Sequence, residues 1–171
     1  MPASWFQYPL VTVGNVIQLE KKQWTVLRQY GERDAQASSD DPPSFVSTKL
    51  KCQSGNITAY MRIFMQVPFI GTESTPPHER AKQATTFNPR ELQALSRLTT
   101  KGSRFAPRLL DTSIQTQDSV NGLVPGGALV FLVWEIVPGV RLGDTLGSDV
   151  FWALSPDERN RIRAALVRGY E

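Results

Sequence analysis

Residues 45–52 alternate apolar and polar side chains, the period-two pattern of a strand with one buried face. The segment Ser54-Gly55-Asn56 that follows has the composition of a tight turn. A second β-prone run, residues 57–67, is apolar over more of its length and ends at Pro68. The two runs predict a β-hairpin whose first strand is amphipathic and whose second strand is more fully buried.

Three further segments predict strands of the same sheet: residues 24–31, 107–118 and 129–137. The segment 129–137 is apolar on both faces, as in a central strand. Residues 1–22 are a mixed lead-in, in which the apolar residues between Val11 and Leu19 indicate a short strand or a docking arm. Residues 34–44 and 71–77 have the composition of loops, and we expect the first to be flexible.

Two segments carry helix signals. Asn88 is a good N-cap, Pro89 suits the first turn, and Glu91 completes a capping box with Asn88. Leucines at 92, 95 and 98 then mark one apolar face, and Gly102 is the expected stop. The second helix begins at Ser155-Pro156-Asp157-Glu158, again a cap with a capping box, and its buried stripe is Ile162, Ala165 and Leu166. Residues 142–152 are compatible with a short helix.

The order of elements predicts an α+β fold: a five-stranded antiparallel sheet with one packed helix, followed by a C-terminal helix. We divide the chain into an N-terminal lead-in (1–22), a sheet domain (23–140), and a linker with the last helix (141–171).

The chain has 171 residues, enough for one domain with a real core. Apolar residues make up 40% and charged residues 20%, as in ordinary soluble globular proteins. No run approaches the roughly 18 apolar residues of a membrane helix, and the N-terminus lacks the basic start and apolar core of a secretory signal. We therefore expect a cytoplasmic protein, with the nucleus as the alternative, and no membrane partner.

The net charge is +3, and the basic residues are spread along the chain. The densest group, Arg159, Arg161, Arg163 and Arg168, is typical of a solvated helix face. Nucleic-acid binders usually cluster Lys and Arg on one face, so we do not expect nucleic acid as a partner.

Cys52 is the only cysteine, which excludes an internal disulfide and fits a reducing compartment. We expect it to be a half-buried strand residue. The only histidine, His78, lies in a Pro-rich stretch. Neither a Cys/His catalytic pair nor a zinc site is expected from one residue of each kind.

Five segments occur in an order that resembles the N-terminal lobe of protein kinases and aminoglycoside-phosphotransferase-like proteins, most of all the fungal kinase-like proteins. The resemblance covers residues 45–171 and rests on the order and spacing of the segments rather than on any single motif. They correspond to the third strand, the following helix, the fourth strand, the fifth strand with the hinge, and the first long helix of the C-terminal lobe. The segments are Ala59-Tyr60-Met61-Arg62-Ile63-Phe64-Met65-Gln66-Val67-Pro68, Glu91-Leu92-Gln93-Ala94-Leu95, Ala106-Pro107-Arg108-Leu109-Leu110-Asp111, Phe131-Leu132-Val133-Trp134-Glu135-Ile136-Val137-Pro138-Gly139 and Leu154-Ser155-Pro156-Asp157-Glu158-Arg159.

The resemblance implies a nucleotide site. Arg62 stands where the family has the lysine that neutralises nucleotide phosphates, and Glu91 stands where a helix glutamate fixes that cation. Ala59 and the backbone of residues 135–137, including Glu135 and Val137, would line one side of an adenine slot. Two alternatives stay open: Arg62 as an ion-paired or solvated strand residue, and Glu91 as a capping-box residue.

The sequence departs from the family pattern at three points. Arg62 replaces the lysine, and a forked guanidinium does not simply substitute for an ammonium. Gly31 is the single glycine between Trp24 and Leu50, where the family has closely spaced glycines over the phosphates. No His-Arg-Asp or Asp-Phe-Gly triplet occurs in the 171 residues, so the resemblance implies no catalytic residue and no metal ligand in this chain. We expect ATP with magnesium to bind weakly, and the chain to be inactive on its own.

The resulting expectation is a kinase-like domain, truncated before the catalytic loop, that acts as a pseudokinase-type interaction module. One alternative is the nucleotide-binding half of an active ATP-dependent phosphotransferase whose C-terminal half is absent from this chain. A third is a small binding protein that uses the sheet for another ligand. The resemblance implies that the C-terminal helix of this chain corresponds to the first helix of a kinase C-terminal lobe, and that the rest of that lobe is absent. Trp152, Leu154, Ile162 and Leu166 would then lack part of their cover, so we expect an apolar surface there for a protein partner or self-association.

Overall fold

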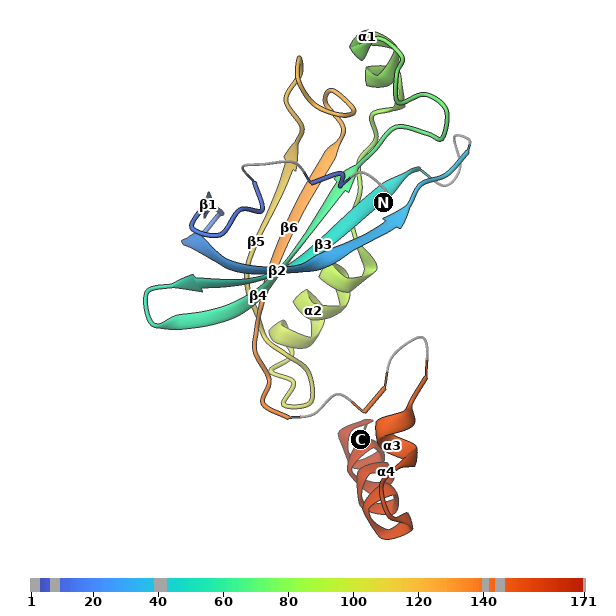
Figure 1. Ribbon diagram of the computed structural model, residues 1–171. Coiled ribbons are helices and arrows are strands. Elements are labelled where there is room, and N and C mark those ends of the chain that lie inside the picture. Colours follow the sequence, from blue (N-terminus) through green and yellow to red (C-terminus); the bar gives the residue numbers. More distant parts are fainter. Residues whose placement is uncertain (1–3, 7–9, 39–42, 140–141, 144–146, 171) are drawn as a thin grey trace. The chain divides into compact units, whose positions relative to one another are not determined.

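The computed structural model of the chain describes residues 4–6, 10–38, 43–139, 142–143 and 147–170 (Figure 1). The chain forms two compact units, Met1–Ile136 and Val137–Glu171. The first unit contains the β-sheet, and the described part of the second contains two helices. The architecture is α+β, as the sequence predicts.

The sheet is antiparallel and has six strands in the order β1-β2-β3-β4-β6-β5. The predicted count of five is one too low because a short strand inside the lead-in, β1, pairs with β2 through Ile17 and Trp24. The strands are Val16–Gln18 (β1), Gln23–Ala35 (β2), Phe45–Ser54 (β3), Ile57–Gln66 (β4), Leu109–Thr116 (β5) and Ala128–Glu135 (β6). The predicted hairpin is confirmed as β3 and β4.

Strand β2 continues past Gly31, where the sequence predicts that the strand ends. Its register with β3 shifts between Gln29 and Glu32, so Tyr30 and Gly31 form a β-bulge. Gly31 has a φ of +113°, which is open to glycine because it has no Cβ. The glycine bends the strand instead of ending it, and β2 extends to Ala35 inside the predicted loop. Residues 39–42 of that loop lie outside the described residues.

The two ends of the sheet meet at Asp111, a fully buried residue of β5. Its carboxylate accepts hydrogen bonds from the backbone N–H groups of Lys21 and Lys22 at 3.1 and 3.0 Å and from the indole N–H of Trp24 at 3.0 Å. A backbone hydrogen bond between residues 20 and 112 lies beside them. Residues 20–22 follow β1 and Asp111 belongs to the opposite edge strand, so the sheet curls until its two ends are joined.

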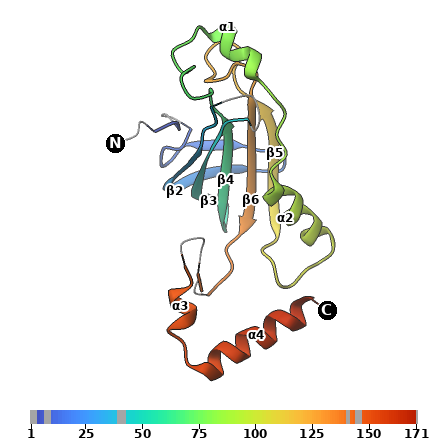
Figure 2. The same cartoon turned by 90° about the vertical axis from the view of Figure 1, so that its right-hand side faces the viewer.

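Each face of the sheet carries an apolar core. The first core contains Ala59, Met61 and Ile63 of β4, together with Trp24 and residues of the lead-in such as Ile17. The second core lies on the opposite face, where α2 (Arg90–Thr100) runs alongside β6 and β5 (Figure 2). Its buried members are Leu92, Leu95, Val130, Leu132 and Trp134. Successive side chains of β4 point to opposite faces of the sheet, so this strand contributes to both apolar cores.

Helix α2 begins at Arg90 rather than at the predicted cap, Asn88. Pro89 takes the N-cap position, and no side chain caps the helix. Glu91 turns toward Arg62 of β4 and not back toward Asn88, so the predicted capping box is wrong. The tertiary contact with a cation outweighs the local hydrogen bond. The other end agrees with the prediction, because Gly102 follows the last turn with a φ of +68°.

A short helix that the sequence does not predict, α1 (Pro77–Arg80), and a 3₁₀ turn at Ala81–Gln83 precede α2. The buried Gln66 ties this segment to the sheet. Its Nε2 donates to the carbonyl of Gln83 at 2.5 Å, and its Oε1 accepts from the N–H of Ala128 at 3.3 Å. The segment between β4 and α2 is therefore held against the end of β6.

The second unit contains α3 (Asp149–Trp152) and α4 (Pro156–Tyr170). The predicted capping box opens α4. Oγ of Ser155 accepts from the N–H of Glu158 at 3.3 Å, and Oε2 of Glu158 accepts from the N–H of Ser155 at 3.0 Å. Residue 140, the last of the predicted sheet domain, and residues 141 and 144–146 of the predicted linker lie outside the described residues.

Candidate functional site

Arg62 of β4 and Glu91 of α2 form an ion pair, in which Nη1 of Arg62 lies 2.5 Å from Oε2 of Glu91. The two side chains are 23% and 30% exposed, so water is partly excluded from the pair. The guanidinium also lies 5.7 Å from the centre of the Trp134 ring. Of the two roles left open for Glu91, pairing with Arg62 is the one that the structure contains.

The period of β4 explains why Arg62 faces the helix. Tyr60 and Phe64, two positions away on either side, pack against the second core beneath α2. On the helix, Leu92 and Leu95 are buried against the sheet, and Glu91 in the first turn therefore lies next to β4. Burial of the apolar neighbours brings the cation and the carboxylate together.

The other three candidate residues do not join this pair. Ala59 is fully buried in the first core, on the opposite face of β4 from Arg62. Glu135 is the register partner of Ala59, and its backbone N–H donates to the carbonyl of Arg108 at 3.1 Å. Val137 is 56% exposed and opens the second unit. Beside Arg62, the α2 face of β4 carries the ring of Tyr60 instead of a small residue.

A row of neighbouring aromatic and cationic side chains extends from Arg62 across the sheet. Tyr60 lies between Trp134 and Tyr30, with ring centres 6.1 and 5.9 Å apart. The ammonium of Lys49 lies 3.7 Å from the centre of the Tyr60 ring. Sequence reasoning did not identify Tyr30, Lys49 or Tyr60 as site residues, although Lys49 and Tyr60 lie in the two strands of the predicted hairpin.

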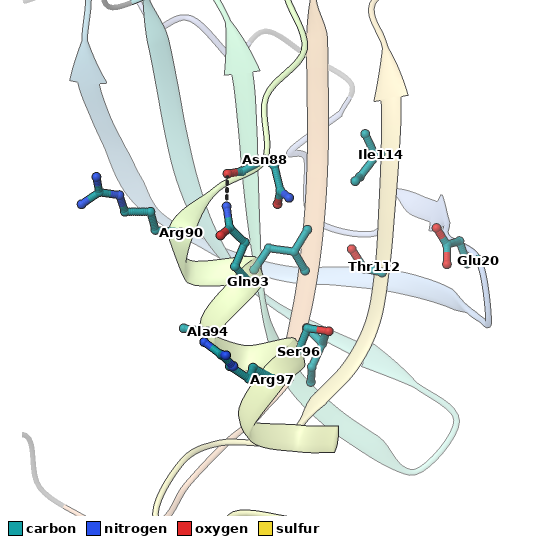
Figure 3. Close-up of a pocket in the computed structure, with 11 residues that line it drawn as sticks. Glu20, Asn88, Arg90, Gln93, Ala94, Ser96, Arg97, Thr112 and Ile114 are labelled. Carbon is teal, nitrogen blue, oxygen red and sulfur yellow. Dashed lines mark hydrogen bonds between the residues drawn. The ribbon is translucent and has the colours of Figure 1, made fainter. Parts of the chain in front are cut away.

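A pocket of about 760 Å³ lies between α2 and β5 (Figure 3). Gln93 and Arg97 of α2 and Ile114 of β5 contribute to its wall, and Nε2 of Gln93 donates to the carbonyl of Asn88 at 3.0 Å. A second pocket of about 410 Å³ shares Asn88 and Ile114 with it. None of the five candidate residues lines either pocket, so these hollows are separate from the Arg62–Glu91 pair.

Cys52 is fully buried, where the sequence predicts half-burial. Burial raises the pKa of its thiol to about 12, which suppresses the thiolate that a nucleophile or metal ligand requires. His78 is exposed on α1, with Nε2 3.3 Å from Oε1 of Glu79. Among the described residues, no group of three or more His, Cys, Asp or Glu side chains is arranged to hold a metal ion.

No helix in the described part of the chain has the length and apolar character needed to cross a membrane. No protein-family model matches the chain. No curated protein matches it either.

Proposed function

We propose that this chain is a non-catalytic interaction module with the arrangement of a kinase-like N-terminal lobe. The observation that carries the proposal is the contact between Arg62 and Glu91. A strand cation fixed by a helix carboxylate is the arrangement that the kinase resemblance implies, and it joins residues 29 positions apart in the chain.

The environment of Arg62 favours a structural role over phosphoryl transfer. Its charge is offset by Glu91, and its guanidinium lies 5.7 Å from the centre of the Trp134 ring. The 171 residues contain no triplet of the His-Arg-Asp or Asp-Phe-Gly type. Phosphoryl transfer depends on a group that orients the hydroxyl and on metal ions that neutralise the phosphates. We therefore propose that the fold is used for binding and not for phosphoryl transfer.

The second unit supplies the interaction surface. Trp152, Leu166 and Val167 are 58%, 58% and 61% exposed, and Leu154 and Ile162 are half-buried. Exposed apolar side chains on neighbouring turns of a helix favour contact with a protein partner or a second copy of the chain. Leu166 and Val167 are exposed large apolar side chains near the end of α4, and they carry this part of the proposal.

Calorimetric titration with Mg-ATP tests the non-catalytic part. We expect a dissociation constant no tighter than about 0.1 mM, or about 5.5 kcal/mol of binding. Arg62→Ala should leave this weak binding unchanged and destabilise the fold. Micromolar binding that Arg62→Ala abolishes would instead favour the second candidate, the nucleotide-binding half of a phosphotransferase, in which the partly exposed Arg62 contacts phosphate.

Sedimentation velocity tests the interaction surface. The wild-type chain should self-associate at high concentration, and Val167→Glu should shift it to monomer. The matched control is Val120→Glu, because Val120 is 68% exposed in the β5–β6 connection. A monomeric wild type, or an equal effect of both substitutions, would contradict this surface.

A further inference from the structure

Strand β5 forms one edge of the sheet, and its outer side is only partly covered. The carbonyl of Thr112 accepts from the backbone N–H of Glu20 at 3.4 Å, so it points away from β6. Backbone groups along a strand alternate between its two sides, so Ile114 and Thr116 also direct their N–H and C=O groups outward. Among the described residues, no backbone group from outside the sheet bonds to these outward groups. The edge of β5 is therefore open from Ile114 to Thr116.

The two pockets described above lie beside this open edge. The larger one, of about 760 Å³, lies between α2 and β5, and the smaller one, of about 410 Å³, shares Asn88 and Ile114 with it. Figure 3 shows Asn88 and Gln93 on the α2 side of the larger pocket and Ile114 on the β5 side. Ile114 contributes to both pockets and is 60% exposed. We refer to the two adjoining pockets together as the β5 groove.

A strand added to β5 would place side chains in the β5 groove. Residues directly opposite each other in an antiparallel pair point to the same face of the sheet. The residue that exchanges backbone hydrogen bonds with Ile114 would therefore point into the groove, and so would the residue two positions before it, opposite Thr116. Ala94, Leu109 and Ile114 supply apolar contacts in the larger pocket. The groove thus suits a strand with apolar side chains at alternate positions.

Two arginines of α2, Arg90 and Arg97, line the larger pocket, and both side chains are exposed. Within the described part of the chain, neither side chain forms a hydrogen bond or an ion pair. Glu20 is the single carboxylate among the described residues that line this pocket, and those that line the smaller pocket carry no charge. The β5 groove is therefore complementary to a partner with acidic groups.

The position of Arg97 indicates which end of the partner is acidic. The N–H of Leu109, at the start of β5, donates to Oγ1 of Thr99 at 2.8 Å, so the end of α2 that carries Arg97 lies beside the start of β5. An antiparallel partner runs from Thr116 toward that start. Past the open segment, the edge is occupied by Glu20, whose carboxylate repels an acid. An acidic C-terminal end would therefore turn from the edge into the groove, toward Arg97.

We propose that the β5 groove binds an extended peptide segment of another protein, which adds to β5 as an antiparallel strand and carries acidic residues at its C-terminal end. Backbone hydrogen bonds to Ile114 and Thr116 supply affinity, and the apolar contacts in the groove and the ion pair with Arg97 supply selectivity. The site belongs to the first unit and does not use the apolar side chains of α4. It therefore goes beyond the proposed function, and either proposal can fail without the other.

Fluorescence anisotropy of a labelled peptide mixed with the full chain tests the proposal. The probe is a heptapeptide in which three valines alternate with two threonines and two glutamates follow. We expect saturable one-to-one binding with a dissociation constant below about 1 mM. Methylation of the backbone nitrogen of the central valine, which faces β5, should weaken binding about tenfold or more, whereas methylation of the next threonine nitrogen, which faces away, should change it little. A probe with its glutamates at the N-terminal end should also bind more weakly.

Substitutions in the chain test the same contacts from the other side. Thr116→Pro removes an N–H that points outward and keeps the hydrogen bonds between β5 and β6, so the variant should fold and bind about tenfold more weakly or worse. Arg97→Glu should weaken binding by a similar factor. The matched control is Arg104→Glu, because Arg104 is an exposed cation of the α2–β5 loop that lines neither pocket. Circular dichroism and urea denaturation check that each variant is folded.

Absence of probe binding at millimolar concentration would overturn the proposal. So would an equal loss with the two methylated probes, or equal effects of Arg97→Glu and Arg104→Glu. Self-association of the wild-type chain that Thr116→Pro abolishes would identify a second copy of the chain as the occupant of the edge, and it would also overturn the peptide proposal. Val167→Glu of α4 should leave probe binding unchanged, which separates this site from the proposed function.

Discussion

The indole nitrogen of Trp24 lies 3.0 Å from Oδ2 of Asp111, and this hydrogen bond connects strands that are not neighbours in the sheet order. Both residues are fully buried, and they are 87 positions apart in the chain. The same carboxylate accepts from Lys21, Lys22 and Thr112. One side chain therefore satisfies several backbone donors where the two ends of the sheet meet.

Asp111→Ala should lower the free energy of unfolding by about 3 kcal/mol, because it leaves the buried indole N–H of Trp24 and three part-buried backbone N–H groups without their acceptor. Trp24→Phe, which removes only the indole donor and some apolar area, should lower it less than Asp111→Ala does. Urea denaturation followed by tryptophan fluorescence and circular dichroism measures both. The control is Asp118→Ala, because Asp118 accepts backbone hydrogen bonds in an exposed turn. Equal effects of Asp111→Ala and Asp118→Ala would show that the junction does not stabilise the sheet.

Arg62 and Glu91 should be coupled by about 1 kcal/mol in a double-mutant cycle of unfolding free energies. The pair is partly shielded, which strengthens it relative to an exposed surface pair. Arg62→Ala should cost more than Glu91→Ala, since it also removes the contact with Trp134. The comparison cycle uses Lys82 and Glu79, an exposed pair at 2.9 Å, for which we expect a smaller coupling. If the effects of Arg62→Ala and Glu91→Ala on the unfolding free energy are additive, the contact between the two residues does not stabilise the fold.

Cys52 should be protected from thiol reagents in the folded protein. Burial raises its pKa from 9.0 to about 12, so at pH 8 the thiolate is about a thousandfold less abundant than in an exposed cysteine. Reaction with a disulfide reagent such as DTNB should be slow in buffer and fast in urea. Cys52→Ala, which has no thiol, serves as the control for background reaction. Rapid labelling of the folded chain would mean that β3 opens readily at this position.

The hydrogen bonds between Ser155 and Glu158 should be detectable as a lowered pKa of the Glu158 carboxyl group. The hydroxyl and then the backbone N–H of Ser155 lower the pKa of Glu158. Their stabilising effect is present above the ordinary glutamate pKa and is lost as the pH falls through the lowered value. Carbon-13 NMR of the full chain should show the pKa of Glu158 rising toward its ordinary value in Ser155→Ala. The pKa of Glu79, which the hydrogen bond from Lys82 lowers, should stay unchanged. A Glu158 titration that Ser155→Ala does not move would contradict the cap.

Elements with local signals are predictable from this sequence. Alternation and turn composition suffice for β3 and β4, and the capping box at Ser155 is confirmed. The cap at Asn88 fails because local rules do not include Arg62, which reaches Glu91 from another strand. The contact between Arg62 and Glu91 was suggested by the family resemblance, and periodicity alone would not have paired them.

The candidate site was harder to predict because it depends on register. A strand has a period of two, so Ala59 and Arg62, three positions apart, lie on opposite faces, and the sequence itself contains that information. The pairing of Arg28 with Lys51 is different. Arg28 shares a face with Lys51 only because the register shifts between Val26 and Arg28. Such a bulge depends on how β2 meets β3 and leaves no local signature in the sequence.

The junction at Asp111 also bears on aggregation. An open sheet has two edges whose unpaired backbone groups invite strands from other molecules. Here residues 20–22 contact β5, so part of one edge is occupied by the chain's own opposite end. Solubility and folding stability are therefore linked through one carboxylate. If Asp111 is lost, the exposed edge of β5 lengthens, and intermolecular strand pairing becomes the competing way to satisfy its backbone.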